Sequence, residues 1–243
     1  MHSNIQPNKS LGQNFLKSTA IAKSLIKLVK KDDNVIEIGP EEGIITNEIL
    51  KKTSNITCIE KDERLCNILK SRFPDISVLN MDVLEFNLEN IEYKNFQIVG
   101  ALPYYISKDI ISKFIKGKIR PYNLSAILQK EVAQKYTSPG ELLNNTAKIY
   151  AEEIKGGEII KKEEFYPKPK VDSKIIYIKN IYEYDKSQVL FEKFIKRNYS
   201  NPRKKLKNVN PLVSWGEFEH KRAQELSFKD WIKLYRENED ILN

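Results

Sequence analysis

Short runs rich in β-branched residues alternate with amphipathic helical stretches through the first 130 residues of the chain. The runs are short and apolar enough for strands buried on both faces, whereas the stretches between them repeat their apolar residues at helical spacing. This alternation is typical of a parallel sheet covered by helices, because parallel strands need a crossover connection. We expect strands over residues 34–40, 56–60, 75–82, 96–103 and 124–130, and helices over 18–31, 44–52, 63–73 and 108–117.

The strand signals end with two runs, over residues 158–162 and 173–181, which fit an antiparallel edge of the same sheet. Beyond Tyr182 the pattern predicts helices only, separated by a break at Ser200–Pro202 and a basic turn. A chain of 243 residues has room for a main domain and a smaller partner. We therefore expect an α/β domain over residues 1–183 and an all-helical domain over 184–243, with helices over 188–199 and 217–237.

The net charge of +8, from 41 Lys and Arg against 33 Asp and Glu, favours a polyanionic partner such as nucleic acid. The excess gathers between Lys193 and Lys207, a segment with seven basic residues and no acidic one. Phe194 and Tyr199 lie among these basic residues, which suits contact with RNA; a solvated helix face is the plainer alternative. The residues expected to bind RNA are Lys196, Arg197, Arg203, Lys204, Lys205 and Lys207.

The sequence gives little support for export, membrane insertion or a metal site. No segment approaches the roughly 18 consecutive apolar residues that a membrane helix needs. Cys58 and Cys66 lie far from either histidine, in a predicted strand and a predicted helix, so neither a disulfide nor a zinc site is expected. We expect a cytoplasmic monomer with reduced cysteines and no bound metal.

Three successive predicted strands end in residues that suit a nucleoside ligand. The first ends in EIGPEEG, where Gly39 and Gly43 frame a turn into a helix and leave room for a ligand close to the backbone. Glu60 ends the second strand, where it can accept hydrogen bonds from a ribose diol, and Asp82 ends the third, placed for an adenine amino group. Because the G-x-G-x-x-G pattern of pyrophosphate-binding folds is missing, S-adenosylmethionine fits better than a dinucleotide.

Further motifs occur together with these strand ends. They are LGQNFL (11–16), EIGP..G (37–43), IEKD (59–62), LPYYIS (102–107), LQKEVAQK (128–135), FYPKPKVDS (165–173), NPRKKLKN (201–208) and RAQELSFKDWIKL (222–234). With them the chain resembles the ribosomal RNA adenine N6-dimethyltransferases over nearly its whole length. The resemblance implies a Rossmann-like S-adenosylmethionine-dependent methyltransferase sheet, a small helical C-terminal domain, and ribosomal RNA or an immature ribosomal subunit as partner.

The resemblance favours one branch of that family and leaves alternatives open. PKVDS followed by the basic NPRKKLKN is similar to the small-subunit enzymes that dimethylate two adjacent adenines. The large-subunit enzymes that confer macrolide resistance share the fold, cofactor and reaction. A non-catalytic RNA-binding factor for ribosome assembly or transcription is a further alternative. A small-molecule or DNA methyltransferase is a further alternative, and the basic C-terminal helices argue against a small substrate.

The resemblance also implies roles for individual residues. The residues expected around the cofactor are Gln13, Asn14, Leu16, Gly39, Glu41, Glu60, Lys61, Asp82, Val83 and Ala101. Those expected around the target adenine are Ala101, Leu102, Pro103, Tyr104 and Phe165. Tyr104 would stack on one face of the adenine and Phe165 would cover the other, an arrangement suited to a base extruded from RNA; core packing is the alternative role for both rings.

Two positions depart from the family pattern. The family motif Asn-(Leu/Ile)-Pro-(Tyr/Phe) supplies a side-chain oxygen that, with a backbone carbonyl, aims the target amine at the methyl group, but this chain has Ala101. Losing one acceptor is expected to impair methyl transfer by about 2 to 4 kcal/mol, or roughly 30- to 1,000-fold. Glu41 replaces the middle glycine of GPGxG, where its carboxylate either crowds and repels the methionine end of the cofactor or attracts its ammonium group. If residue 41 needs a positive φ, strain of about 1 kcal/mol is added.

Overall fold

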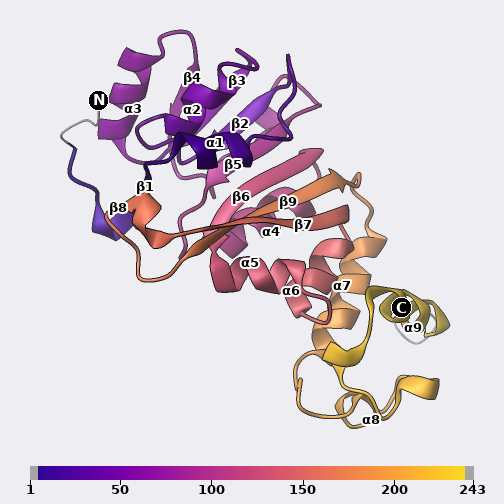
Figure 1. Ribbon diagram of the computed structural model, residues 1–243. Coiled ribbons are helices and arrows are strands. Elements are labelled where there is room, and N and C mark those ends of the chain that lie inside the picture. The colour runs from indigo at the N-terminus through magenta and orange to yellow at the C-terminus, as the bar shows by residue number, and fades with distance from the viewer. Residues whose placement is uncertain (1–4, 239–243) are drawn as a thin grey trace.

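The computed structural model describes residues 5–238, and its central feature is a seven-stranded mixed sheet (Figure 1). The strand order is β4-β3-β2-β5-β6-β9-β7, with β2 to β6 parallel and β9 antiparallel to both of its neighbours. The predicted α/β architecture is therefore confirmed. The strands are β2 (Val35–Ile38), β3 (Ile56–Glu60), β4 (Ser77–Asn80), β5 (Gln97–Ala101), β6 (Asn123–Gln129), β7 (Ala151–Ile160) and β9 (Ser173–Ile181).

Different helices cover the two faces of the sheet, because successive residues of each buried strand point to opposite faces. On β2, Ile36 and Ile38 join the cluster that contains the apolar residues of α4 to α6, whereas Val35 joins the cluster of α1 and α2. The helices are α1 (Thr19–Leu25), α2 (Ile44–Ile49), α3 (Glu63–Arg72), α4 (Ser107–Lys116), α5 (Lys130–Thr137), α6 (Leu142–Lys148), α7 (Ser187–Asn198), α8 (Leu206–Val209) and α9 (Phe228–Glu237). No helix within residues 5–238 is long and apolar enough to cross a membrane.

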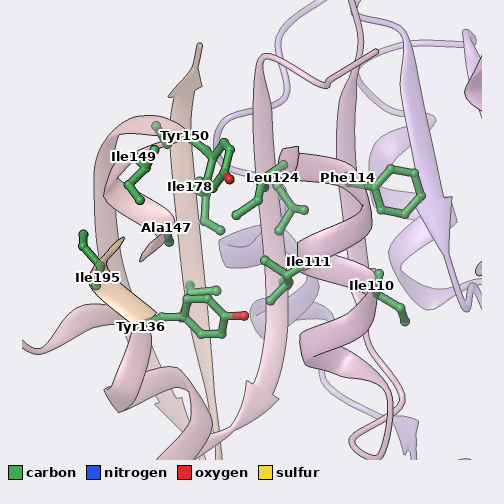
Figure 2. Close-up of a cluster of buried hydrophobic side chains, with 14 of the residues drawn as sticks. Ile110, Ile111, Phe114, Leu124, Tyr136, Ala147, Ile149, Tyr150, Ile178 and Ile195 are labelled. Atoms are coloured by element: carbon green, nitrogen blue, oxygen red, sulfur yellow. The ribbon is translucent and has the colours of Figure 1, made fainter. Parts of the chain in front are cut away.

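The C-terminal helices share one hydrophobic cluster with α4 to α6, and Figure 2 shows Ile111 of α4 and Ile195 of α7 within it. Phe194 of α7 is 3% exposed, and its ring lies 6.0 Å from that of Trp231, centroid to centroid. Tyr199 donates its hydroxyl to the carbonyl oxygen of Gly140 at 2.8 Å. The expectation that Phe194 contacts RNA is therefore wrong, because its ring lies in the core, whereas Tyr199 is half-buried against the same cluster.

Three of the predicted segments differ markedly in extent from the observed elements. The run expected over 158–162 is the end of a longer strand, β7. The register of β7 shifts between Gly156 and Ile159, which interrupts the alternation of residues on its two faces. The helix expected over 217–237 is α-helical only from Phe228, because Ser227 and Asp230 form a capping box that starts a new helix there. The helix expected over 18–31 ends at Leu25.

One acidic side chain lies inside the sheet. Glu37 of β2 is fully buried, and its Oε2 accepts a hydrogen bond from the Thr46 hydroxyl at 2.7 Å, while its Oε1 has no hydrogen-bond partner. Burial disfavours the charged form and raises the pKa of Glu37 to about 7. The folded chain therefore holds a proton at Glu37 that the unfolded chain releases at lower pH.

Truncation of Phe194 is expected to destabilise the whole molecule. Phe194→Ala should lower the free energy of unfolding by about 3 to 5 kcal/mol, since the ring fills space between α7 and α9 that a methyl group leaves empty. Urea denaturation measures the change. Lys193→Ala, on the exposed side of α7, is the matched control and should change the stability by less than about 0.5 kcal/mol. An equally small effect of Phe194→Ala would contradict the packing described.

Glu37 predicts a pH dependence of stability. The pKa of Glu37 is higher in the folded state than in the unfolded state, so its contribution to the free energy of unfolding is fully present at a pH below the unfolded-state pKa. This contribution, of up to about 3 kcal/mol, is lost as the pH rises toward the folded-state pKa of about 7. Glu37→Gln keeps an acceptor for Thr46 but has no proton to lose. Urea denaturation from pH 5 to pH 8 should therefore show a shallower loss of stability in this variant than in the parent chain. Parallel pH profiles would contradict the assignment.

Candidate active site

The carboxyl ends of β2, β3 and β5 and the loop after β4 open into one pocket, as expected where parallel strands end at the same edge of a sheet. The predicted residues that line it are Gln13, Asn14, Gly39, Glu41, Glu60, Lys61, Asp82, Val83, Ala101, Leu102, Pro103, Tyr104 and Phe165. Leu16 lies buried beside the pocket without lining it. Sequence reasoning missed Leu11, Gly12, Ile38, Ile59, Met81, Tyr105, Ile106 and Ile127, most of which adjoin a predicted residue and carry no polar signal of their own.

The turn after β2 is built around glycine. Gly39 has φ +63°, and a Cβ there would lie 3.6 Å from the Ala101 carbonyl oxygen, inside the pocket. Gly43 has φ +84°, and a Cβ there would lie 2.6 Å from the Phe73 ring. Both positions favour glycine, which keeps the floor of the pocket open and lets α2 start close to α3.

Glu60 is held in place at the end of β3. The side chain is 6% exposed; its Oε1 accepts the backbone N–H of Asp62 at 2.9 Å, and its Oε2 accepts that of Glu41 at 3.4 Å. Burial raises the pKa of Glu60 above its ordinary value. The carboxylate is thus an anchored acceptor, able to bind a second donor such as a hydroxyl group.

Asp82 and Asp62 differ from Glu60 because each carboxylate has a cationic partner. Lys61 Nζ lies 2.8 Å from Asp82 Oδ2, and this hydrogen bond lowers the pKa of Asp82. Arg64 binds Asp62 and lowers its pKa to about 2. Asp62 remains ionised at neutral pH and accepts a hydrogen bond from Gln13 Nε2 at 2.9 Å.

The N-terminal segment is attached across the pocket to residues far along the chain. β1 (Phe15–Leu16) pairs antiparallel with β8 (Phe165–Tyr166), so that Leu16 lies opposite Phe165. Gln13 holds the same segment to Asp62 at the start of α3. The segment therefore connects the strand-end acids to the aromatic side of the pocket.

Tyr104 and Phe165 form the aromatic side of the pocket. The Tyr104 ring is half-buried, and its hydroxyl shares a 2.7 Å hydrogen bond with Ser173 Oγ on β9. Phe165 is 3% exposed. Both line the same pocket as Glu60 and Asp82. A flat ligand between these rings would lie beside the strand-end acids.

Glu41 has a positive φ of 55°, the conformation that favours glycine. Its Oε2 accepts the backbone N–H of Leu16 at 3.3 Å, and its half-buried side chain lines the pocket. Burial, followed by the charge of Glu60, holds the pKa of Glu41 well above its usual range. The positive φ expected at this position is therefore present, and the residue lines the pocket beside Leu16.

The basic residues near the C-terminus lie on a different part of the molecule. Arg203, Lys204 and Lys205 are exposed in the loop before α8, at the end of the chain's fold opposite β1 and β8 (Figure 1). Lys196 and Arg197 are exposed at the end of α7, where Lys196 pairs with Glu192 at 2.8 Å. Lys207 is also exposed, on α8. None of these basic residues lines the pocket.

Solved structures share this fold. A crystal structure of the 23S rRNA methyltransferase ErmE matches with a TM-score of 0.78 and 21% identity, covering 92% of this chain and 98% of that one. A dimethyladenosine transferase from Plasmodium falciparum matches with a TM-score of 0.77 and 20% identity, covering 93% and 98%. The chain therefore has the Rossmann-like fold of these methyltransferases.

Sequence relatives identify the family. The family model described as ribosomal RNA adenine dimethylase matches residues 4–234. The ribosomal RNA small subunit methyltransferase A of Mycoplasmopsis synoviae is 33% identical over 213 residues, 84% of this chain and 82% of that protein. That of Francisella tularensis is 33% identical over 257 residues, 96% of this chain and 98% of that protein. The chain belongs to the ribosomal RNA adenine dimethylase family.

Proposed function

We propose that this protein transfers methyl groups from S-adenosylmethionine to the N6 amino group of two adjacent adenines in small-subunit ribosomal RNA. The observation that carries the proposal is the shared pocket, in which strand-end acids meet the rings of Tyr104 and Phe165. Such a pocket suits a nucleoside cofactor on one side and a flat base on the other. The protein would act as a monomer in the cytoplasm, on ribosomal RNA or an immature ribosomal subunit.

The charges of the pocket support this cofactor. S-adenosylmethionine carries positive charge on its sulfonium and ammonium groups, and the pocket contains Glu60, whose carboxylate accepts two backbone N–H groups of the described chain. Glu60 suits the ribose hydroxyls, and Asp82 with the Val83 backbone suits the adenine. Gly39 leaves room for the methionine part, with Gln13, Asn14 and Leu16 closing over it. The cofactor would supply a methyl carbon made electrophilic by the sulfonium charge.

The aromatic half supports an extruded adenine as the second ligand. The hydrogen bond to Ser173 fixes the Tyr104 ring, and the pairing of β8 with β1 fixes Phe165. A base between two fixed rings is positioned before reaction, which removes much of the entropic barrier to methyl transfer. Leu102 and Pro103 continue from β5 toward Tyr104, so their backbone suits the amine side of that base.

The observations disfavour one alternative function and support another. Sequence relatives about one-third identical carry the name small subunit methyltransferase A, which favours the small-subunit branch over the macrolide-resistance branch. A non-catalytic RNA-binding factor is the second candidate, because Ala101 offers no side-chain acceptor at the tip of β5. Methyl incorporation into RNA decides between an enzyme and such a factor.

Substitutions in the two halves of the pocket should have separable effects. Glu60→Gln should weaken S-adenosylmethionine binding by about 10- to 150-fold, the effect of losing a hydrogen bond to a charged group. Tyr104→Ala should slow methyl transfer about 10-fold or more through lost stacking, while cofactor affinity stays within a few-fold. Calorimetry and radiolabelled methyl incorporation into immature small subunits measure both, with Glu63→Gln, at an exposed position of α3, as control. Tight RNA binding with neither cofactor binding nor incorporation would favour the non-catalytic factor.

Charge reversal at the basic loop should weaken RNA binding. Replacing Arg203, Lys204 and Lys205 with Glu should lower RNA affinity at least 10-fold and reduce its salt dependence, because each phosphate contact releases a counterion. The control makes the same charge change at Lys31, Lys70 and Lys94, which are exposed in the sheet half of the chain. Filter binding at several salt concentrations measures both variants. Equal effects in the two variants would mean that net charge, and not this loop, governs binding.

A further inference from the structure

The tip of β5 lacks a polar side chain, whereas a carboxylate lies in the same pocket. Residue 101 is alanine, and its neighbours Leu102 and Pro103 are apolar as well. Glu41, from the turn after β2, lines the pocket together with Ala101, Tyr104 and Phe165. An amine held between the two rings would therefore find no side-chain acceptor on β5, and Glu41 is an acceptor that reaches this pocket from another strand.

One hydrogen bond of its carboxylate and one of its backbone place Glu41 in the pocket. Its Oε2 accepts the backbone N–H of Leu16 at 3.3 Å, and Leu16 pairs with Phe165 in the β1–β8 ladder. The backbone N–H of Glu41 donates to Glu60 Oε2 at 3.4 Å. The residue therefore bridges the acid at the end of β3 and the aromatic side of the pocket, where a methyl donor and its acceptor would meet.

The backbone of Glu41 indicates that the side chain has a function. A φ of 55° is strained for a residue with a Cβ, and a glycine at this position would relieve the strain. Such strained residues cluster at active sites, where the function of the side chain offsets the energetic cost of the backbone strain. Glu41 combines this strain with a place in the pocket lining, and its carboxylate accepts a hydrogen bond from the Leu16 backbone.

We propose that Glu41 is a catalytic residue whose carboxylate accepts a hydrogen bond from the target amine and then takes its proton, in place of a side-chain acceptor at residue 101. The inference rests on the proposed function. The amine nitrogen forms the new bond to the methyl carbon while the carbon–sulfur bond breaks, leaving its electron pair on sulfur. The nitrogen, now positively charged, gives one proton to the carboxylate, which later releases it to water. The hydrogen bond also keeps the nitrogen lone pair aimed at the methyl carbon.

The surroundings of Glu41 suit a proton acceptor. The charged groups that face it are Glu60 on β3, Glu37 on β2 and Glu42 in its own turn, and Tyr104 is the titratable group that it influences on the aromatic side. Burial and these neighbours raise the pKa of Glu41, which makes its ionised form a better base. Methyl transfer needs the ionised form, so its rate should fall as the pH drops through this raised pKa.

A double-mutant cycle between residues 41 and 101 tests the proposal. The variants are Glu41→Gly, Ala101→Asn and both together, with single-turnover methyl transfer measured on immature small subunits at saturating S-adenosylmethionine. Glu41→Gly should slow transfer roughly 30- to 1,000-fold, the loss of one acceptor at the reacting atom. The same change made with Ala101→Asn should leave the rate within about 3-fold of the parent chain, because the asparagine then supplies the acceptor. Glu41→Gly removes backbone strain, so it should not impair folding.

Two further readouts separate a catalytic from a cofactor-binding role. Glu41→Gln should retain part of the rate and lose the fall of activity at low pH, because the amide accepts a hydrogen bond but no proton. Affinity for S-adenosylmethionine and S-adenosylhomocysteine, measured by calorimetry, should change less than about 3-fold in both Glu41 variants. A 10-fold loss of cofactor affinity with an unchanged saturated rate would instead make Glu41 a counter-ion for the cofactor and overturn the proposal.

The outcome of the cycle also separates a failure of this inference from a failure of the proposed function on which it rests. An equal effect of Glu41→Gly in both backgrounds at residue 101, or a faster rate in the glycine variant, overturns the role of Glu41 and leaves the proposed methyltransferase activity intact. Absence of methyl transfer in the Glu41→Gly, Ala101→Asn chain, which carries the family residues at both positions, overturns the proposed activity itself and the role of Glu41 with it.

Discussion

The close approach of β2 and β5 at their carboxyl ends is the constraint on which the pocket depends. The strands are parallel and Ile38 lies beside Gly100, where a Cβ would come within 2.5 Å of the Ile38 carbonyl oxygen. A glycine at residue 100 lets the strand ends meet. The turn at Gly39 then lies against Ala101, so that the residues suited to a cofactor and those suited to its target share one cavity. A larger residue at position 100 would separate the two halves.

Charge is divided within the molecule in a way that suits the ligand proposed for each part. The chain has a net charge of +8, yet its pocket contains Glu41, Glu60 and Asp82 and a single basic residue, Lys61, which pairs with Asp82. The exposed basic residues at the end of α7 and before α8 account for much of the excess. Under the proposed function, the acidic pocket would attract a cationic cofactor and the basic surface would attract RNA, so each site would select against the ligand of the other.

Local sequence patterns predicted the sheet and its strand-end residues, and failed where contacts join distant segments. Glu60 and Asp82 could be predicted as pocket residues because each follows Gly39 at a spacing set by the intervening helices and strands. The two-residue strands β1 and β8 have no periodicity to detect, so the pairing of Leu16 with Phe165 appears only in three dimensions. Phe194 was misread because an aromatic residue among lysines has the same local pattern whether its ring is buried or exposed.

Ala101 and Glu41, the two departures from the family pattern, can be explained together but not one at a time. Considered separately, Ala101 removes an acceptor and Glu41 adds strain and negative charge, so each would weaken an enzyme of this family. In the folded chain both residues line one pocket, and the hydrogen bond from Leu16 holds the added carboxylate on the side where Phe165 lies. Because a carboxylate accepts both a hydrogen bond and a proton, it can do more for a reacting amine than the amide that the family places on β5. The strained turn then has a function that a glycine could not perform.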